Sequence, residues 1–516
     1  MKRFYQISLY CLFSLITLLL ASCGGGSEEN TDPIVSDPLI LRNCSLAEGA
    51  EVTAADITTI TLSYNNKVIV SPSKITLNGS PVEAKNGSSK LEVAISVSLE
   101  EGKSYQLQVP AGAVVKEEDT SVSATVFTLN FKTKEAPKPL DNEATRLSKK
   151  LGWGWNLGNH FDSYDGNNAA GNFKITWSKD CPYWDGVNPT ETLYKNLAAA
   201  GVKTVRIPVT WGPYEDMNDG KYTIDSDYMK IVKQNVLWAK SAGLNVILNT
   251  HHDEYWQDAY SASNSTDTNN SIKERLTATW TQIAEEFKEE GDYLILEVFN
   301  ELNHNWQAPT TKELQIQNEW NQLCVDAIRK TGGQNATRWI AVPSYQANIG
   351  YALKSEFKVP NDAANKIIVA VHCYDPYNFT LQDPLTETWG HGAGNSYDES
   401  NVVKTLNQLY DSFILKNQPC YLGEFGCSIH TSELGEQCRM YYLEYFCRAA
   451  HFANLSLMLW DNNVSKGGPE SHGYFNHKDG SFVNNSESII KTMINAAESN
   501  DANYTLESIY AKAPKK

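Results

Sequence analysis

Two glutamates, far apart in the sequence, each end an apolar stretch with the length of a buried strand. Glu301 ends the stretch Tyr293-Leu-Ile-Leu-Glu-Val-Phe-Asn-Glu301, and Glu424 directly follows Tyr421-Leu-Gly. In barrels of parallel strands, residues at the carboxyl ends of the strands face the loops in which the chemistry takes place. Two carboxylates on one such face can protonate a leaving oxygen and attack the adjacent carbon or activate water, as cleavage of a glycosidic bond requires. The sequence therefore predicts a working pair of carboxyl groups.

Other polar residues follow predicted strands in the same way. Every strand of a parallel barrel ends at one mouth, so side chains at these ends meet even when they are distant in sequence. One polar residue at a strand end means little, but polar and aromatic residues at the ends of six predicted strands are typical of an active site. Besides the two glutamates, this set contains Arg206, His251, Asn300, His372, Tyr374 and Trp460.

The elements that must position these residues alternate regularly. From about Asn142, apolar strand patterns alternate with longer helical patterns, which predicts βαβ units and a parallel sheet. Eight repeats predict an α/β fold, a (β/α)8 TIM barrel over residues 143–510 with enlarged loops. A doubly wound sheet is the alternative, disfavoured because no glycine-rich phosphate loop follows the first strand. The expected strands end near Trp155, Pro208, Asn249, Phe299, Ala341, Val371, Gly423 and Trp460. The expected helices are Thr190–Ala200, Ser226–Ser241, Ile272–Glu290, Lys312–Lys330, Val402–Lys416, Gly435–Ala450 and Ser486–Glu498.

Residues 39–133 have a different pattern. Short alternating runs separated by Asn-Gly and Glu-Gly turn signals predict about seven strands in a small all-β sandwich. The segments 107–115 and 125–131 resemble bacterial Ig-like modules of surface proteins. We expect this module to be a spacer, with glycan binding as the alternative. It has no tryptophan, and its four aromatic residues make a flat sugar-stacking platform hard to build. Residues 134–142 contain two prolines and are expected to be a linker.

The amino-terminal segment is typical of a targeting signal. Lys2 and Arg3 precede an apolar run from about Ile7 to Leu20, and Ala21-Ser22-Cys23 follows. This order resembles a bacterial lipoprotein signal, so residues 1–22 are expected to be removed and Cys23 to carry lipid. Residues 23–38 are expected to be a flexible tether. A plain secretory signal is the alternative. We therefore expect an exported lipoprotein at the outer membrane or cell surface of a Gram-negative bacterium.

The composition narrows the classes of partner. The 516 residues include 41% hydrophobic and 20% charged residues, a normal globular balance. The net charge of −17 argues against nucleic acid, whose phosphates require Lys and Arg. The ten cysteines show no metal-ligand spacing, and most are expected to be small buried hydrophobic residues. We expect a monomer with an uncharged partner.

The motifs at the strand ends resemble glycoside hydrolase family 5 over residues from about 150 to 500. The first three are Gly154-Trp-Asn-Leu-Gly-Asn159, Val205-Arg-Ile-Pro-Val-Thr-Trp211 and Asn249-Thr-His-His-Asp253. The others are Phe299-Asn-Glu-Leu302, His372-Cys-Tyr374 and Gly423-Glu-Phe-Gly426. The opening motif, the paired histidines and Tyr374-Asp-Pro-Tyr-Asn-Phe379 look most like subfamily 4, which contains β-1,4-glucanases, xyloglucanases and mixed-linkage glucanases. The resemblance implies a retaining endo-β-1,4-glucanase that needs no cofactor and no metal.

The resemblance also implies a role for each matching residue. Glu301 would be the general acid/base, with a pKa raised by nearby negative charge and partial burial. Glu424 would be the nucleophile, hydrogen-bonded by Arg206 and Tyr374. Asn300 would bond the 2-hydroxyl of the sugar, and His251 and His372 would position that sugar and the catalytic pair. The residues that are expected to bind substrate are Arg206, His251, His252, Asn300, His372, Tyr374, Trp460, Asn159, Trp184 and Trp389.

Three points of the site stay open in the sequence. His251 and His252 beside two acidic residues could suggest a metal site, but adjacent residues leaving a strand point to opposite sides, which disfavours joint ligation. After Asn159, the chain reads His160-Phe-Asp162, where relatives often have a smaller polar residue and then an aliphatic one. The preferred glucan is also open: a xyloglucanase, a mixed-linkage glucanase and, less favoured, a mannanase are the enzyme alternatives, and a noncatalytic glycan-binding protein is the alternative of another class.

Tryptophan placement supports a carbohydrate partner. Most of the 13 tryptophans fall at predicted strand ends or on the loops after them. Indole rings at such a mouth can stack on the apolar faces of sugar rings while polar residues bind the hydroxyls. A long cleft of this kind implies cleavage within a polysaccharide chain.

Overall fold

The computed structural model describes residues 37–71, 74–134, 140–164, 184–391, 393 and 397–515. The chain divides into two compact units, Met1–Pro139 and Leu140–Lys516, and each is described by itself. The expected signal peptide at 1–22, the lipidation site Cys23 and nearly all of the tether lie outside the described residues. Among the residues that are described, no helix is long and apolar enough to cross a membrane.

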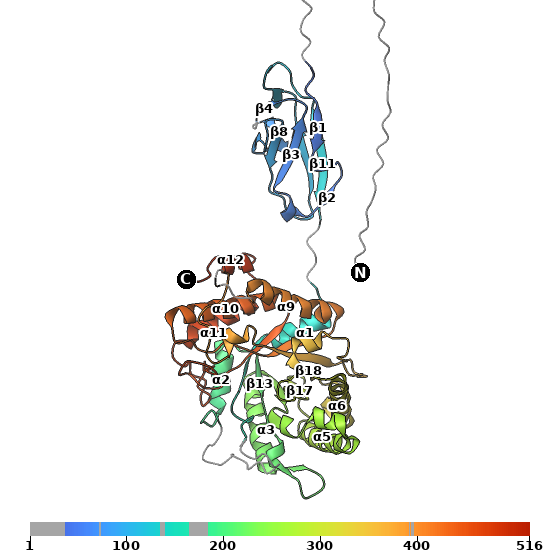
Figure 1. Cartoon of the computed structure of the whole chain (residues 1–516), viewed down its shortest axis with the longest axis vertical. Coiled ribbons are helices and arrows are strands. Elements are labelled where there is room, and N and C mark those ends of the chain that lie inside the picture. Colours follow the sequence, from blue (N-terminus) through green and yellow to red (C-terminus); the bar gives the residue numbers. More distant parts are fainter. Residues whose placement is uncertain are drawn as a thin grey trace, which may run out of the picture. The chain divides into compact units, whose positions relative to one another are not determined.

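The first unit is built around one core from two larger sheets of mostly antiparallel strands and one separate two-stranded sheet (Figure 1). Alternation decides which side chains enter that core: in the strand 127–133, Leu129, Phe131 and Thr133 are buried while the residues between them are exposed. Because the buried faces of both sheets contribute to a single apolar cluster, the unit is a β-sandwich. One sheet has the order β1 (Leu41–Cys44), β3 (Thr59–Tyr64), β8 (Glu92–Ser96), β7 (Ala84–Asn86). The other has the order β2 (Glu51–Val52), β11 (Phe127–Thr133), β9 (Ser104–Val109), β5 (Thr76–Leu77), β6 (Ser80–Pro81), and β4 (Val68–Val70) pairs separately with β10 (Val114–Lys116).

The second unit is a closed barrel of eight parallel strands, so the predicted (β/α)8 TIM barrel is confirmed. The strands are apolar almost throughout because helices cover their outer side and other side chains fill the interior. Each strand pairs with its neighbours in sequence, and the first strand pairs with the last to close the barrel. In order, the strands are β12 (Trp153–Asn156), β13 (Thr204–Ile207), β16 (Asn245–Asn249), β17 (Leu294–Glu297), β18 (Ile340–Asn348), β19 (Ile367–Cys373), β20 (Cys420–Phe425) and β21 (Ser456–Leu459).

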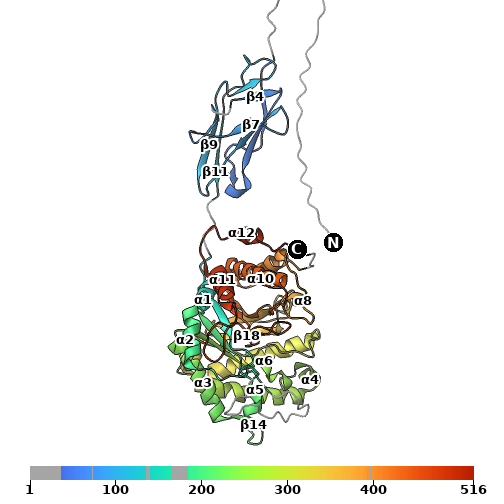
Figure 2. The same ribbon diagram turned by 90° about the vertical axis from the view of Figure 1, so that its left-hand side faces the viewer.

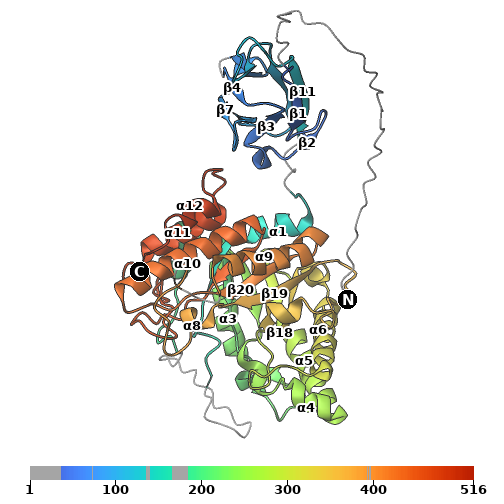
Figure 3. The same ribbon diagram turned by 45° about the horizontal axis from the view of Figure 1, so that its top comes forward.

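The outer helices agree closely with the sequence prediction. Two helices have the predicted bounds, two differ by one residue at the start, and three differ at both ends by two to six residues. In Figures 1 and 2, α5 and α6 lie side by side, and Figures 1 and 3 show α10 beside α11. These helices are α2 (Glu191–Ala200), α3 (Ser226–Ser241), α5 (Thr266–Glu286), α6 (Thr311–Lys330), α9 (Glu399–Ser412), α10 (Glu433–Phe452) and α11 (Ser486–Glu498). Shorter helices that the sequence did not predict are α4 (Ala259–Asn264), α7 (Ile349–Ala352), α8 (Tyr377–Thr380) and α12 (Leu506–Tyr510).

Helix α1 (Glu143–Leu151) closes the end of the barrel opposite the loops that follow the strands. The side chain of Asn142 accepts a hydrogen bond from the Thr145 N–H, and the hydroxyl of Thr145 in turn accepts one from the Asn142 N–H, which forms a capping box. The helix leads directly into β12, and its Leu147 and Leu151 pack against the apolar cluster inside the barrel. The strands therefore have one open end, and the polar residues of the sequence analysis lie there.

Candidate active site

Arg206, on β13, is the central cation at the mouth of the barrel. It is completely buried, yet its guanidinium donates to four side chains that come from three other strands or the residues just after them. Such an always-charged, planar group with five donors can hold several carboxylates and amides in fixed positions. Its acceptors are Asn156 Oδ1 at 3.0 Å, Glu297 Oε1 at 2.6 Å, Asn300 Oδ1 at 2.7 Å and Glu424 Oε1 at 2.8 Å.

Glu297 is a buried carboxylate that sequence reasoning missed. It ends β17, four residues before Glu301, and besides Arg206 it accepts hydrogen bonds from Asn249 Nδ2 at 3.0 Å and from the Tyr421 hydroxyl. Burial alone would raise the pKa of Glu297, but the charge and hydrogen bonds of Arg206 outweigh burial and lower it. The available signal was a glutamate inside the apolar run Leu294-Ile-Leu-Glu297, since a charged residue in a buried strand needs a counter-charge.

Removal of the central cation is expected to destabilise the barrel strongly. In an Arg206→Met protein, Glu297 and Glu424 would be left buried without their counter-charge, which costs about 3–5 kcal/mol of unfolding free energy. Urea unfolding followed by tryptophan fluorescence measures this cost, and the signal reports on the barrel because residues 39–133 contain no tryptophan. The control is Arg146→Met, which breaks the exposed ion pair with Asp141 and is expected to change little. Equal stability of the Arg206→Met protein and the parent would contradict this role.

Glu424, the candidate nucleophile, lies at the end of β20 with its carboxylate held by donors. Arg206 Nη1 donates to its Oε1 at 2.8 Å, and the Tyr374 hydroxyl donates to its Oε2 at 3.0 Å. The side chain is only 7% exposed, so these bonds are formed away from bulk water. Donors of this kind stabilise the ionised carboxylate and aim its lone pairs. The expected contacts of Glu424 with Arg206 and Tyr374 are therefore present.

Glu301, the candidate acid, lies in a different environment. Desolvation by burial is the largest effect on its pKa; Arg206 and His252 lower the pKa and Glu254 and Glu297 raise it, so that the result is about 7. The Nδ1 atom of His372 lies 2.5 Å from Glu301 Oε1. Burial and Arg206 hold the pKa of His372 at about 4, so its ring is neutral near pH 7. The prediction of a raised pKa agrees with this environment, although burial contributes more than neighbouring charge.

The two glutamates are close enough to act on one bond. One carboxylate oxygen of Glu301 and one of Glu424 lie within 4.8 Å of each other, with a ring nitrogen of His372 at similar range. Glycosidases that retain the anomeric configuration place their carboxyl groups about 5–5.5 Å apart, whereas inverting enzymes need about 6.5–9.5 Å to admit a water molecule. The short separation fits direct attack by a carboxylate.

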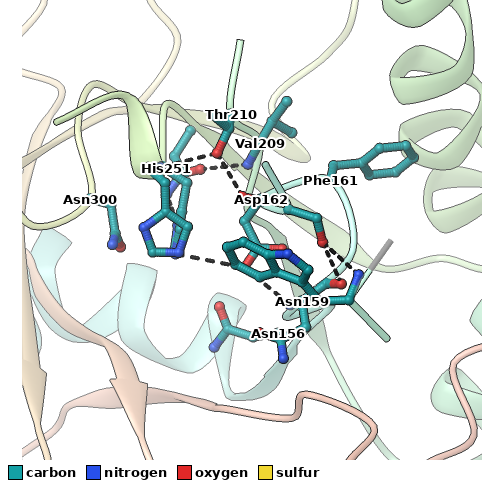
Figure 4. Close-up of polar contacts among 12 residues, drawn as sticks. Asn156, Asn159, Phe161, Asp162, Val209, Thr210, His251 and Asn300 are labelled. Carbon is teal, nitrogen blue, oxygen red and sulfur yellow. Dashed lines mark hydrogen bonds and ion pairs between the residues drawn. The ribbon is translucent and has the colours of Figure 1, made fainter. Parts of the chain in front are cut away.

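His251 and His252 do not point to opposite sides, which corrects the sequence argument. The strand β16 ends at Asn249, and a 3-10 turn begins at His252, so the alternation of a strand no longer applies. The two rings meet edge to face at 4.6 Å, and Asp162 Oδ2 lies 4.0 Å from His251 Nε2. Figure 4 shows Asp162 facing His251, held by the Asn159 N–H at 3.0 Å and through its carbonyl by the Thr210 hydroxyl at 2.8 Å.

Two groups of side chains at the mouth have donor atoms close enough to hold a cation. They are Asp162 with His251 and His252, and Glu301 with His372 and Glu424. In the second group, Arg206 already supplies a positive charge to Glu424. In the first, Glu254 lies 3.1 Å from His252 Nδ1, and although burial alone would lower the pKa of His252, Glu254 raises it to about 9. A protonated imidazole does not ligate a metal, so a cation in the first group would have to displace the proton of His252.

Two of the tryptophans that were expected to bind substrate, Trp460 and Trp184, lie beside the paired histidines. The Trp460 ring stacks on His251 with centroids 5.9 Å apart, and Trp184 lies beside His252 with centroids 5.7 Å apart and is 45% exposed. The backbone of Asn159 adopts a positive φ and accepts the Asp185 N–H at 2.9 Å, so this residue shapes the adjoining loop. These residues lie along one side of the mouth.

Trp389 was predicted to bind substrate, and this prediction is wrong. It is 2% exposed and packs among Phe379, Tyr442 and other aromatic residues between α8 and α10. Its indole nitrogen donates to the carbonyl of Tyr397 at 3.0 Å. With 2% of its surface exposed, Trp389 has almost no area left for contact with a sugar ring. The sequence places Trp389 on a loop after a strand but does not reveal that this loop folds back under α10.

The site lies at the mouth of an eight-stranded parallel barrel and pairs Glu301, whose pKa is raised, with Glu424, which Arg206 and Tyr374 hold. This combination is that of the retaining glycoside hydrolases. Residues 162–466 match the model of the cellulase family, glycosyl hydrolase family 5, and the chain belongs to this family.

Known proteins resemble the second unit over most of its length. A solved structure described as a native Bacteroidetes-affiliated GH5 cellulase linked with a polysaccharide utilization locus is 36% identical, with a TM-score of 0.67, and the match covers 73% of this chain and 99% of that chain. A GH5-4 broad specificity endoglucanase from Bacteroides salanitronis is 35% identical, with a TM-score of 0.63, over 71% of this chain and 99% of that chain. Endoglucanase A of Clostridium longisporum is 32% identical over 63% of this chain. The match covers 60% of the length of that relative.

Proposed function

We propose that this protein is a retaining endo-β-1,4-glucanase that cleaves β-glucan chains by double displacement. The observation that carries the proposal is the pair of carboxyl groups within 4.8 Å whose surroundings differ: donors hold Glu424, and burial raises the pKa of Glu301 to about 7. A protonated acid next to an ionised nucleophile is the division of labour that this reaction needs.

In the first step, Glu424 attacks the anomeric carbon from one face of the sugar, and the bond to the leaving glycosidic oxygen breaks. The proton of Glu301 goes to that oxygen, so the departing chain leaves as a neutral alcohol. In the second step, Glu301, now ionised, takes a proton from water, and the resulting hydroxide attacks the same carbon and displaces Glu424. Two inversions retain the configuration, and both glutamates return to their starting protonation states.

The bonds around the pair support these steps. Arg206 and Tyr374 hold Glu424 so that one oxygen is aimed at the sugar, and the same Arg206 fixes the orientation of the Asn300 amide. Neutral His372 lies against Glu301 and can exchange a hydrogen bond with it in either protonation state. Fixed partners of this kind reduce the reorganisation that accompanies each charge change.

The substrate class is tested by product analysis. Barley β-glucan, carboxymethyl cellulose, tamarind xyloglucan and glucomannan are incubated with the full chain and with its Glu424→Gln form. Mixed oligosaccharides that form early in the reaction, and only with the parent, are expected and indicate cleavage within the chain. Release of a single short product would contradict endo action, and the rank order of rates separates the glucanase, xyloglucanase and mannanase alternatives. Binding of these glycans without any cleavage would instead favour a noncatalytic glycan-binding protein.

The pKa of Glu301 predicts the alkaline side of the pH profile. Glu301 must carry its proton at the start, so the active fraction is full below the pKa and falls tenfold per pH unit above it. On β-glucan, kcat/KM is therefore expected to decline above about pH 7. In the Glu301→Gln protein, the residual rate should lack this decline because no proton is lost at residue 301. A parent rate that stays constant to pH 9 would contradict the assignment.

We also propose that the protein is exported and attached to a membrane through lipid on Cys23, with the sandwich unit acting as a spacer. The order of basic, apolar and small residues before Cys23 supports this proposal. Expression in a Gram-negative host with radioactive palmitate is expected to label the parent but not the Cys23→Ala form, and only the parent should sediment with membranes. Equal labelling of both forms would refute the anchor. Protease treatment of intact cells then distinguishes an outward from a periplasmic orientation.

A further inference from the structure

A line of buried titratable groups lies behind the mouth of the barrel and takes no part in the steps above. His160 Nδ1 lies 3.1 Å from Asp185 Oδ2, and the same oxygen lies 2.9 Å from His477 Nδ1. On its other side, His477 Nε2 lies 3.1 Å from Asp461 Oδ1. The side chains of Asp185, His477 and Asp461 are fully buried, and that of His160 is 1% exposed. We call His160, Asp185, His477 and Asp461 the buried relay.

The geometry of the relay sets the protonation of His477. Both ring nitrogens face a carboxylate oxygen, and a carboxylate only accepts hydrogen bonds, so both nitrogens must carry hydrogen. His477 is therefore an imidazolium ion between two aspartates. Burial would lower its pKa, but Asp461 and Asp185 raise it to about 9, in agreement with the hydrogen-bond geometry. His160, beyond Asp185, is the next titratable group in the line.

The two aspartates hold two different loops. Asp461 lies two residues after the end of β21; its Oδ2 accepts the Trp155 indole N–H at 2.9 Å and the Phe475 N–H at 2.9 Å. Asp185 lies in the loop between β12 and α2, where its N–H donates to the Asn159 carbonyl at 2.9 Å. Asn463 joins the loops a second time, because its Nδ2 donates to the Asp185 carbonyl at 2.9 Å. His477 thus links both loops through charge at a point that water does not reach.

Each aspartate is the direct neighbour of a tryptophan at the mouth. Trp184 precedes Asp185, and Trp460 precedes Asp461. Between these tryptophans lie His252 and His251, and the four rings form a continuous row. Successive centroids are 5.7 Å apart from Trp184 to His252, 4.6 Å from His252 to His251 and 5.9 Å from His251 to Trp460. The relay therefore holds the chain at both ends of this ring row.

We propose that His477 is a positioning residue for substrate: through Asp185 and Asp461 it fixes the two loops that carry Trp184 and Trp460 to the mouth of the barrel. The inference rests on the proposed glucanase function. Without a cation at 477, two buried carboxylates would repel each other, and the loops that carry Trp184 and Trp460 would move apart or take in water. Misplacement of a positioning group by about 1 Å can cost about a hundredfold in rate. Because His477 bonds Asp185 and Asp461 and not the two glutamates that react, we expect its loss to change KM and Kd more than kcat.

The test compares binding and turnover in variants of the relay. His477→Gln removes the charge and one of the two donors, and Asp185→Asn releases only the Trp184 end. His451→Gln is the control, because His451 lies on α10 and bonds the Ala497 carbonyl. KM and kcat are measured on cellotetraose and β-glucan, and Kd for cellotetraose is measured by tryptophan fluorescence with each change placed in the Glu424→Gln protein. Circular dichroism and melting curves establish that each variant is folded.

The expected result is a rise in KM and Kd of about tenfold or more in His477→Gln, a smaller rise in Asp185→Asn, and kcat within a few-fold of the parent. A His477→Arg form, which keeps the charge and both donors, should recover part of the lost affinity. A purely structural role would lower the melting temperature and the active fraction but leave Kd of the folded protein unchanged.

Folded variants whose KM and Kd stay within twofold of the parent would overturn the positioning role. Failure of both His477→Gln and Asp185→Asn to fold would also overturn it, because the relay would then serve the stability of the barrel. A parent that cleaves no glucan would overturn the proposed function, whereas an active parent with unchanged variants overturns only this inference.

Discussion

Replacement of Glu424 by Gln is expected to reduce glucan hydrolysis by at least about 10⁴-fold while binding of the substrate stays nearly unchanged. Glutamine has the shape of glutamate, and its amide oxygen can still accept the bond from Arg206 Nη1 at 2.8 Å. The neutral amide, however, cannot displace the leaving group at the anomeric carbon, so no glycosyl-enzyme forms. The loss is therefore expected in kcat and not in the affinity for oligosaccharide.

The measurement is initial rates on β-glucan together with the Kd for cellotetraose. Chemically matched changes serve as controls, and Glu319→Gln is the most informative. Asn318-Glu319 repeats the Asn-Glu dipeptide of the active site, but Glu319 lies on the outer helix α6 and pairs with Lys273 at 2.7 Å. It should retain full activity. Hydrolysis by the Glu424→Gln protein within tenfold of the parent would remove Glu424 from the role of nucleophile.

Replacement of Glu301 by Ala is expected to slow hydrolysis of β-glucan by about 10²–10⁴-fold, the usual contribution of a general acid/base. Aryl glycosides with good leaving groups need less help from a proton, so their first step should suffer less, and the glycosyl-enzyme on Glu424 should accumulate. Added azide needs no general base and fits the space left by the carboxyl group. It should therefore restore turnover and form a glycosyl azide with retained, β configuration.

Product configuration decides this prediction, and it is read by NMR of the glycosyl azide. An α-azide would mean that azide attacks the sugar directly and takes the place of Glu424, which would reverse the two assignments. Absence of any rescue would argue that Glu301 does not act as the acid/base. The Glu424→Gln protein provides the internal comparison, because it keeps the acid but offers no enzyme nucleophile.

Much of this site could be predicted because of one property of parallel barrels. Residues that end successive strands meet at one mouth, so Arg206, Glu301, Tyr374 and Glu424 could be grouped without knowing any distance. The structure brings them together with Asn300 and His372. The bounds of α3 and α11 were also predicted correctly, because their apolar faces and flanking polar residues are local signals.

Predictions failed where the chain leaves its regular elements. Alternation along a strand said that His251 and His252 point apart, but β16 ends two residues earlier and the rings meet. Trp389 was predicted from its place on a loop after a strand, as Trp184 was, yet it packs against α10 and is buried. Backbone direction in such loops depends on distant packing, which a local pattern does not contain.

The sequence by itself determined the number of barrel units, the end of the barrel that carries the chemistry and the pair of glutamates, because strand period, helix period and residue type are properties of short segments. Only the tertiary structure decided the protonation states of the ionisable side chains at the site. The ion pair of Glu297 with Arg206 depends on burial and on partners from distant strands and loops. The same holds for the pKa of Glu301 and for the positive charge of His477. Desolvation and charge pairing act through space, so the fold had to be known before the roles of these residues could be assigned.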